Sequence, residues 1–132
     1  MIFVDTGAWF AAFVPNDRDH VRADTWLSSN TTPLVTSDYI LDELLTLLKA
    51  RGEYQRALHL GQCLLTEKIA RLEWVLPADV EAAWQSYRTH RDKDWSFTDC
   101  VSLAVMKRLR IRKAFSFDEH FRQFAAITVV PL

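Results

Sequence analysis

Short apolar runs alternate with longer stretches of helical periodicity along the chain. The short runs are rich in β-branched and aromatic residues and predict strands over residues 2–4, 34–36, 70–76, 113–117 and 127–130. The longer stretches predict helices over residues 6–14, 18–29, 38–51, 53–67, 78–91 and 97–110, with a short helix that starts from Asp118. Strands that alternate with helices indicate an α/β protein whose central, mainly parallel β-sheet is covered on both faces.

The spacing of apolar residues within two helices predicts which side chains are buried. In residues 38–51, one broad stripe of isoleucine and leucine runs along the helix, and Glu43 lies at its edge, about 40° from Leu47. We therefore expect Glu43 to be half-buried and Asp42 to be exposed. Residues 97–110 are apolar almost all round, which predicts a buried helix with Asp99 in its first turn.

Length and composition indicate one domain over residues 1–132. Hydrophobic residues make up 49% of the 132 residues and charged residues 25%, as is usual for a globular domain that folds without disulfides. The three glycines do not form a phosphate-binding loop, and the histidines and cysteines lack zinc-site spacing. The apolar run of residues 8–14 is too short to cross a membrane, and the unpaired Cys63 and Cys100 suit a reducing compartment. We expect a cytoplasmic protein.

Charge is nearly balanced overall but unevenly distributed. The net charge is −1, yet residues 1–48 carry seven acids and two bases, whereas residues 88–113 carry eight bases and three acids. Two hypotheses fit this distribution. Either one part of the protein binds cations and another binds a polyanion, or both parts are simply solvated charged faces.

Four acidic residues far apart in the sequence are expected at one edge of the sheet. Asp5 and Asp118 directly follow predicted strands, and ligands of open parallel sheets bind at the carboxyl ends of the strands. Glu43 and Asp99 lie early in helices that can face the same edge. Because carboxylates held within ~6 Å repel one another, such a cluster needs a counter-charge. Mg²⁺ or Mn²⁺ prefers oxygen ligands and would supply that charge.

Each acid also has a purely structural interpretation. Asp5 could cap the helix of residues 6–14, and Asp118 could cap the short helix that follows it. Ser96 and Asp99 have the spacing of a capping box, and Glu43 could pair with a neighbouring base. These interpretations do not explain why all four acids should lie at one edge, so the joint placement favours a metal site.

Four short motifs resemble the PIN-domain family, especially the VapC-type toxins of prokaryotic toxin–antitoxin systems. They occur in the expected order over nearly the whole chain: residues 1–8 (MIFVDTGA), 42–44 (DEL), 95–100 (WSFTDC) and 115–121 (FSFDEHF). The resemblance implies a PIN-like three-layer α/β/α sandwich and a Mg²⁺- or Mn²⁺-dependent endoribonuclease.

The resemblance also implies roles for individual residues. The acids that match the family's catalytic and metal-binding site are Asp5, Glu43, Asp99 and Asp118, and the matching polar positions beside it are Thr6 and Ser96. By this comparison Asp5, Asp99 and Asp118 hold a metal ion that activates water, while Glu43 holds that water or a second ion. The chain departs from the family at Gly7, where Ser or Asn is frequent, and Asp94 adds a nearby acid of open role.

The family's substrate and partners are RNA, a small antitoxin and a second copy of the chain. Arg88, Arg91 and Lys93 precede the buried helix and are the bases expected to contact RNA phosphates, because residues 107–113 lie about 15 Å from Asp99 along it. Trp9 or Trp95 could stack on unpaired bases, or they could belong to the core or to an interface.

Two alternative functions remain open at this stage. A phosphotransfer domain, either a haloacid-dehalogenase-like phosphatase or a receiver, also places an Asp after a parallel strand. The phosphatase needs a second Asp where Gly7 stands, and the receiver needs an acidic pair where Asp5 stands alone. The other alternative is a non-catalytic PIN scaffold that binds RNA or protein.

Overall fold

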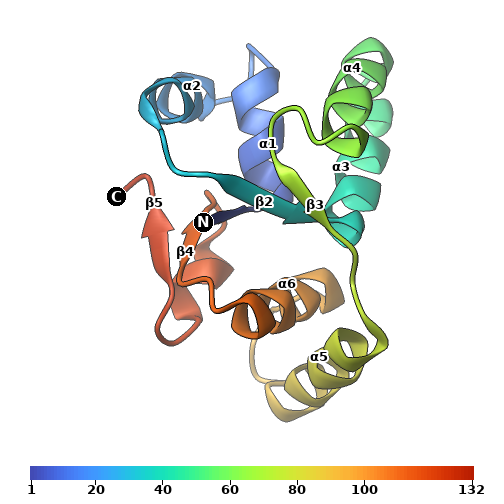
Figure 1. Cartoon of the computed structure of the whole chain (residues 1–132), viewed down its shortest axis with the longest axis vertical. Coiled ribbons are helices and arrows are strands. Elements are labelled where there is room, and N and C mark those ends of the chain that lie inside the picture. The colour runs from blue at the N-terminus through green and yellow to red at the C-terminus, as the bar shows by residue number, and fades with distance from the viewer.

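The computed structural model describes all residues, 1–132, and its central element is a five-stranded sheet (Figure 1). The strands are β1 (Ile2–Val4), β2 (Leu34–Ser37), β3 (Arg71–Glu73), β4 (Lys113–Phe115) and β5 (Thr128–Val130). Their order across the sheet is β3-β2-β1-β4-β5, and every neighbouring pair is parallel. The predicted parallel sheet is confirmed, and no antiparallel strand interrupts it.

Helices cover both faces of this sheet. They are α1 (Thr6–Phe13), α2 (His20–Ser29), α3 (Asp38–Ala50), α4 (Tyr54–Leu65), α5 (Pro77–Thr89) and α6 (Phe97–Leu109), with a short 3-10 helix η1 (Glu119–Gln123). Helices α1 to α4 lie on one side of the sheet, and α5 and α6 lie on the other (Figure 1). The predicted three-layer α/β/α sandwich is confirmed. None of the helices is long and apolar enough to cross a bilayer.

Two strands end earlier than the apolar pattern predicts. The strand expected over residues 70–76 ends at Glu73, because the N–H of Val75 donates to the carboxylate of Asp38 (2.7 Å) instead of to a strand. The strand expected over residues 113–117 ends at Phe115, and the chain then turns so that the N–H of Asp118 donates to the Ser116 hydroxyl (3.0 Å). Both turns occur at the carboxyl edge of the sheet.

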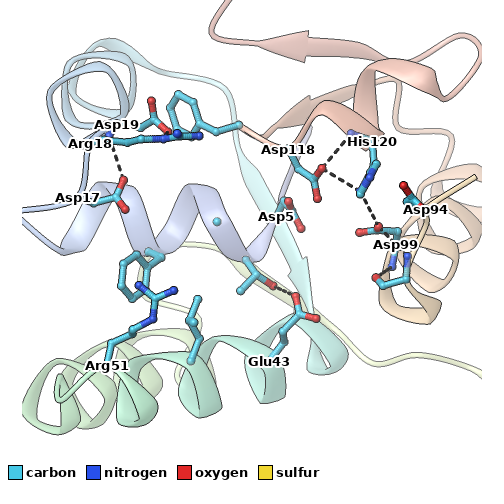
Figure 2. Close-up of a pocket in the computed structure, with 16 residues that line it drawn as sticks. Asp5, Asp17, Arg18, Asp19, Glu43, Arg51, Asp94, Asp99, Asp118 and His120 are labelled. Carbon is cyan, nitrogen blue, oxygen red and sulfur yellow. Dashed lines mark hydrogen bonds and ion pairs between the residues drawn. The ribbon is translucent and has the colours of Figure 1, made fainter.

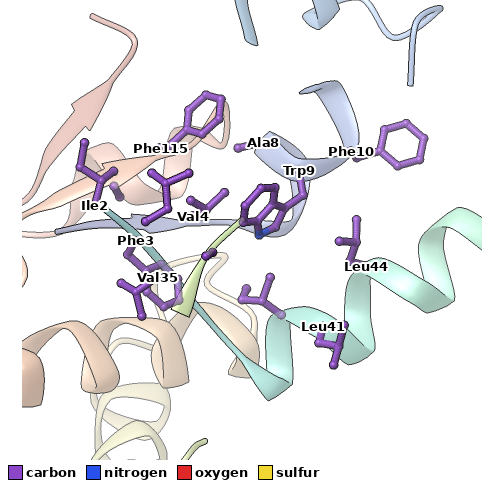
Figure 3. Close-up of a cluster of buried hydrophobic side chains, with 14 of the residues drawn as sticks. Ile2, Phe3, Val4, Ala8, Trp9, Phe10, Val35, Leu41, Leu44 and Phe115 are labelled. Atoms are coloured by element: carbon purple, nitrogen blue, oxygen red, sulfur yellow. The ribbon is translucent and has the colours of Figure 1, made fainter. Parts of the chain in front are cut away.

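The core lies between the sheet and its helices, and Trp9 is at its centre (Figure 3). Its side chain is 1% exposed, and its indole N–H donates to the hydroxyl of Thr36 (3.3 Å), which donates in turn to the carbonyl of Val4 (3.0 Å). The expectation that Trp9 could stack on RNA bases is therefore wrong. Burial of a large aromatic ring with its one polar group satisfied explains this position.

Helices α3 and α6 bury the faces that their sequences predict, with one exception. Residues 100–106 of α6 are buried without interruption, and Ile40, Leu44 and Leu48 of α3 are fully buried. Asp42 is exposed as expected, but Glu43 is also exposed rather than half-buried. Its side chain stands at the rim of an open cleft, where solvent still reaches it.

An ion-pair network joins α6 to α5 and to the end of β3. The guanidinium of Arg108 donates to Asp79 (Nε to Oδ1, 2.9 Å) and to Glu73 (Nη1 to Oε1, 2.9 Å). Asp79 is 3% exposed, and its carboxylate also accepts the N–H of Leu76 at the start of α5 (2.9 Å). Burial raises the pKa of Asp79, but these donors outweigh it and lower the pKa overall. One base of the 88–113 segment is thus structural and is not available to a polyanion.

We expect Arg108→Met to destabilise the fold by about 2–3 kcal/mol, because it leaves the buried Asp79 carboxylate without its charged partner. The measurement is urea unfolding at pH 7, with Lys107→Met as the matched control, since Lys107 is an exposed base of the same helix without a salt bridge. Equal effects of the two substitutions would contradict a structural role for the Arg108 network.

Candidate active site

Asp5 lies at the carboxyl end of β1 and is almost fully buried. It occupies the position before α1, yet its side chain makes no capping hydrogen bond. Its Oδ2 instead accepts a hydrogen bond from the hydroxyl of Ser116, which follows β4 (3.1 Å). The capping interpretation of Asp5 is therefore wrong. Its carboxylate is buried and lines a cleft, and helix capping does not explain this position.

Asp99 is both a helix cap and a cleft residue. The N–H of Asp99 donates to the Ser96 hydroxyl (3.0 Å), and the N–H of Ser96 donates to Oδ2 of Asp99 (3.0 Å). This is the capping box expected from the sequence. The reciprocal bonds fix the side chain in one position, so capping holds the Asp99 carboxylate at the cleft.

Asp118 and His120 complete the acidic wall of the cleft (Figure 2). Oδ1 of Asp118 accepts the N–H of His120 (2.9 Å) at the start of η1, so Asp118 also caps a helix. The Nδ1 atom of His120 lies 3.1 Å from Oδ1 of Asp118 and 3.5 Å from Oδ2 of Asp99. One ligand atom from each of these three residues lies within 4.8 Å of the others, close enough to share an ion.

Glu43 faces this wall from α3, on the other side of the cleft (Figure 2). Its Oε1 accepts a hydrogen bond from the hydroxyl of Thr6 (2.5 Å), the residue that follows Asp5. Glu43 has no salt bridge to any base, so the interpretation of Glu43 as a surface ion-pair residue is wrong. Thr6 thus links the position of Glu43 to the end of β1.

The cleft has a volume of about 560 Å³, and all four predicted acids line it. The predicted polar residues Thr6 and Ser96 also line it, as do Gly7 and Asp94. A methyl group built on Gly7 would contact nothing within 4 Å, so the departure from the family pattern leaves open space.

The sequence did not identify several residues of the cleft. Ser116 lies two positions before Asp118, and His120 lies two positions after it. Their spacing around a predicted site acid could have identified them as candidate site residues. Arg18 and Arg51 contribute the positive side chains of the cleft, and Asp17 and Asp19 lie beside Arg18. No local sequence signal marks these residues, because tertiary packing of α1, α2 and α3 brings them to the cleft.

The three bases predicted to contact RNA lie outside the acidic cleft. Arg91 and Lys93 line a separate hollow on the other side of Asp94, together with Trp95. Arg88 is exposed on α5, where its guanidinium donates to Gln85 (3.0 Å). Trp95 is half-buried, so part of its ring remains accessible.

The electrostatics of the cleft favour a bound cation. Burial, and then the charges of Asp99 and Asp118, raise the pKa of Asp5 to about 7. Burial also raises the pKa of Asp99, although hydrogen bonds from Ser96 act in the opposite direction. A divalent cation would offset the repulsion among these carboxylates, and carboxylate oxygens are the donors that suit Mg²⁺ or Mn²⁺. The residues present therefore fit a metal ion.

Comparison with known proteins agrees with this geometry. Residues 2–127 match the PIN domain family. Over 131 residues, 99% of both chains, the sequence is 33% identical to the 23S rRNA-specific endonuclease VapC20 of Mycobacterium tuberculosis. The crystal structure of M. tuberculosis VapC20 matches 93% of this chain and 94% of its own, with a TM-score of 0.88 and 32% identity.

More distant structures share the fold. A toxin–antitoxin complex from Klebsiella pneumoniae has a TM-score of 0.71 at 12% identity and covers 97% of this chain and 96% of its own. FitAcB from Neisseria gonorrhoeae has a TM-score of 0.71 at 20% identity and covers 98% of this chain and 96% of its own. The family resemblance of the four motifs is confirmed, and the chain belongs to the PIN-domain family.

Proposed function

We propose that the protein is a divalent-metal-dependent endoribonuclease and the toxin of a toxin–antitoxin system. The observation that carries this proposal is the meeting of four acids from separate segments in one cleft, where the buried Asp5 lacks any positive partner within 4 Å. The full-length similarity to VapC20, which is named as an rRNA endonuclease, supports RNA as the substrate. Membership of the PIN-domain family also argues against the phosphotransfer alternatives.

Asp5, Asp99 and Asp118 are the proposed ligands of Mg²⁺ or Mn²⁺, and His120 lies close enough to two of them to join the set. When bound, such an ion supplies positive charge to the phosphodiester and makes a water molecule easier to deprotonate. Ser116 and Ser96 then act as positioning residues, because their hydrogen bonds hold Asp5 and Asp99.

Glu43 is the proposed base on the opposite side of the cleft. The hydroxyl of Thr6 occupies Oε1, which leaves Oε2 free to accept a proton from water. This arrangement suits a general base, because the hydrogen bond from Thr6 keeps the carboxylate oriented while Oε2 accepts the proton. Water that attacks phosphorus from this side would expel the 3′ oxygen and leave a 5′-phosphate.

Positive side chains lie on both sides of the acids. Arg18 and Arg51 line the cleft itself, while Arg91 and Lys93 line the adjoining hollow and Arg88 lies on the exposed face of α5. We propose that these bases hold the RNA backbone, whose phosphate contacts dominate affinity.

We further propose a small antitoxin, a homodimer and a cytoplasmic location. Structural neighbours include a toxin–antitoxin complex and FitAB bound to a DNA fragment, which supports a protein partner. Cys63 and Cys100 are free thiols, which suits the reducing cytoplasm.

We expect cleavage of single-stranded RNA in Mg²⁺ or Mn²⁺ and none in EDTA. Asp99→Asn should reduce the rate at least ~100-fold, because it removes a proposed ligand rather than an outer-shell partner. Asp42→Asn, the exposed acid next to Glu43, is the control and should leave the rate unchanged. The assay is gel analysis of end-labelled RNA with enzymatic identification of the ends.

Two results would contradict this mechanism. Undiminished cleavage in EDTA would show that the reaction needs no divalent metal ion. Products with 2′,3′-cyclic phosphate would mean that the ribose hydroxyl, not water, attacks phosphorus. Absence of cleavage by the unsubstituted protein with any divalent metal would favour the non-catalytic scaffold instead.

We expect Asp5→Asn to stabilise the metal-free protein, increasingly so as pH rises. The pKa of Asp5 is about 7 in the folded protein and near 3.8 when unfolded, so between these values the folded state holds an extra proton. Raising the pH through that interval lowers the free energy of unfolding, by up to ~4 kcal/mol in total. The Asp5→Asn variant has no carboxyl group at this position and should not lose this stability.

The measurement is urea unfolding in EDTA at intervals from pH 4 to pH 8, for Asp5→Asn and the unsubstituted protein. Asp42→Asn provides the control, because that exposed acid should not alter the pH dependence. A variant that is less stable than the parent by the same amount at every pH would show that Asp5 serves the fold.

A further inference from the structure

A second hollow of about 360 Å³ adjoins the acidic cleft, at the loop between α5 and α6. It is lined by three aromatic rings and two bases, together with the acid that it shares with the cleft: Tyr87, His90, Trp95, Arg91, Lys93 and Asp94. We call it the aromatic hollow. None of its rings has a role in the acidic site.

Hydrogen bonding and packing against neighbouring residues fix the rings of the aromatic hollow. The indole N–H of Trp95 donates to Oε1 of Gln123 (2.9 Å), and the ring packs edge-to-face on Phe124, with centroids 4.7 Å apart. Tyr87 packs edge-to-face on Phe97 (5.8 Å). Tyr87 is nevertheless 45% exposed, so part of this residue remains accessible to solvent.

His90 adds a third ring beside Trp95. The two ring centroids are 4.8 Å apart and the planes are tilted by 41°. Nδ1 of His90 lies 3.1 Å from the carbonyl of Ser86, so this nitrogen is occupied by the backbone of α5. The hollow therefore consists of preformed flat surfaces, and a flat ligand binds such surfaces with little loss of side-chain entropy.

The aromatic hollow adjoins the cleft across one short piece of chain. Asp94 lines both, Trp95 lines only the hollow, and Ser96 lines only the cleft. Successive Cα atoms are about 3.8 Å apart, so the two spaces lie within the length of a dinucleotide. A strand whose phosphate lies at the acids can place a neighbouring base in the hollow.

The charged residues of the hollow indicate which kind of ligand it can bind. Arg91 and Lys93 are exposed and have no salt bridge, whereas the cleft beyond Asp94 is dominated by acids. Aromatic rings next to unpaired Arg and Lys side chains are the features that bind single-stranded RNA. The rings stack on nucleobases, and the positive side chains contact phosphates.

We propose that the aromatic hollow binds one unpaired nucleobase of the RNA substrate, next to the phosphodiester that the acidic site cleaves. The base stacks on Tyr87 and Trp95, and Arg91 and Lys93 contact the flanking phosphates. Arg88 lies outside the hollow and makes no contact with this nucleotide. The proposal rests on the proposed function, because it names a binding subsite for that reaction.

The test separates base stacking from charge. Fluorescence anisotropy in Mg²⁺ compares a labelled eight-nucleotide RNA with a fully abasic ribose-phosphate chain of the same length and charge. Asp5→Asn serves as the parent, so that neither probe is cleaved. We expect the parent to bind the base-containing RNA about tenfold more tightly than the abasic chain, as one base stack contributes. Tyr87→Ala should lose that preference and retain its affinity for the abasic chain.

Tyr54→Ala is the matched control, because Tyr54 is an equally exposed tyrosine (51%) on α4, away from both spaces. It should keep the preference. Arg91→Gln with Lys93→Gln should weaken binding of both probes and lower the slope of log Kd against log salt by up to ~0.7 per lost phosphate contact.

Crosslinking locates the base independently of the substitutions. RNA that carries 4-thiouridine, irradiated on the parent and mapped by mass spectrometry, should attach at Tyr87, His90 or Trp95. Crosslinks confined to other surfaces, or an undiminished base preference in Tyr87→Ala, would overturn the proposal and leave the hollow as a surface for a protein partner.

This outcome is distinct from failure of the proposed function. If the unsubstituted protein cleaves RNA and Tyr87→Ala still prefers bases, only the subsite is wrong. If the unsubstituted protein cleaves no RNA and the parent does not distinguish the two probes, both proposals fail.

Discussion

Repulsion among carboxylates held at one edge of a parallel sheet is the constraint that shapes this molecule. The strands β1 and β4 are parallel neighbours that end at the same edge, so their pairing brings Asp5 next to the turn that carries Asp118. Hydrogen bonds from Ser116 and from the capping box then prevent the side chains from turning away from one another. The fold therefore maintains an unfavourable arrangement of charge that a cation can make favourable.

Two of the acids serve local structure and the site at the same time. Asp99 lies in the first turn of α6 and Asp118 caps η1, and in each case the capping hydrogen bond determines where the carboxylate points. The structural and functional interpretations of these residues are consequently not alternatives. Asp5, by contrast, has no capping role and is buried, so its burial is the clearest sign of function in the structure.

The sequence predicted the order of elements, the buried α6 and the acids of the cleft, because these depend on local periodicity and on where strands end. It did not predict residues that reach the cleft through packing between helices, such as Arg18 and Arg51. Strand lengths were overestimated for β3 and β4, since apolar periodicity continues through residues that turn away at the sheet edge. Charge composition also failed to separate a structural base, Arg108, from exposed ones such as Arg91, because the difference is a tertiary contact with Asp79.

Gly7 shows how the site limits the helix that borders it. At the second position of α1 this residue is a weaker helix former than alanine, although no neighbouring atom would obstruct a methyl group. Steric fit inside the protein thus does not account for the glycine. The vacant volume belongs to the cleft, so α1 forgoes intrinsic stability at the point where a bound nucleotide would approach its backbone. The first turn of α1 therefore combines a weak helix former with a wider opening of the cleft.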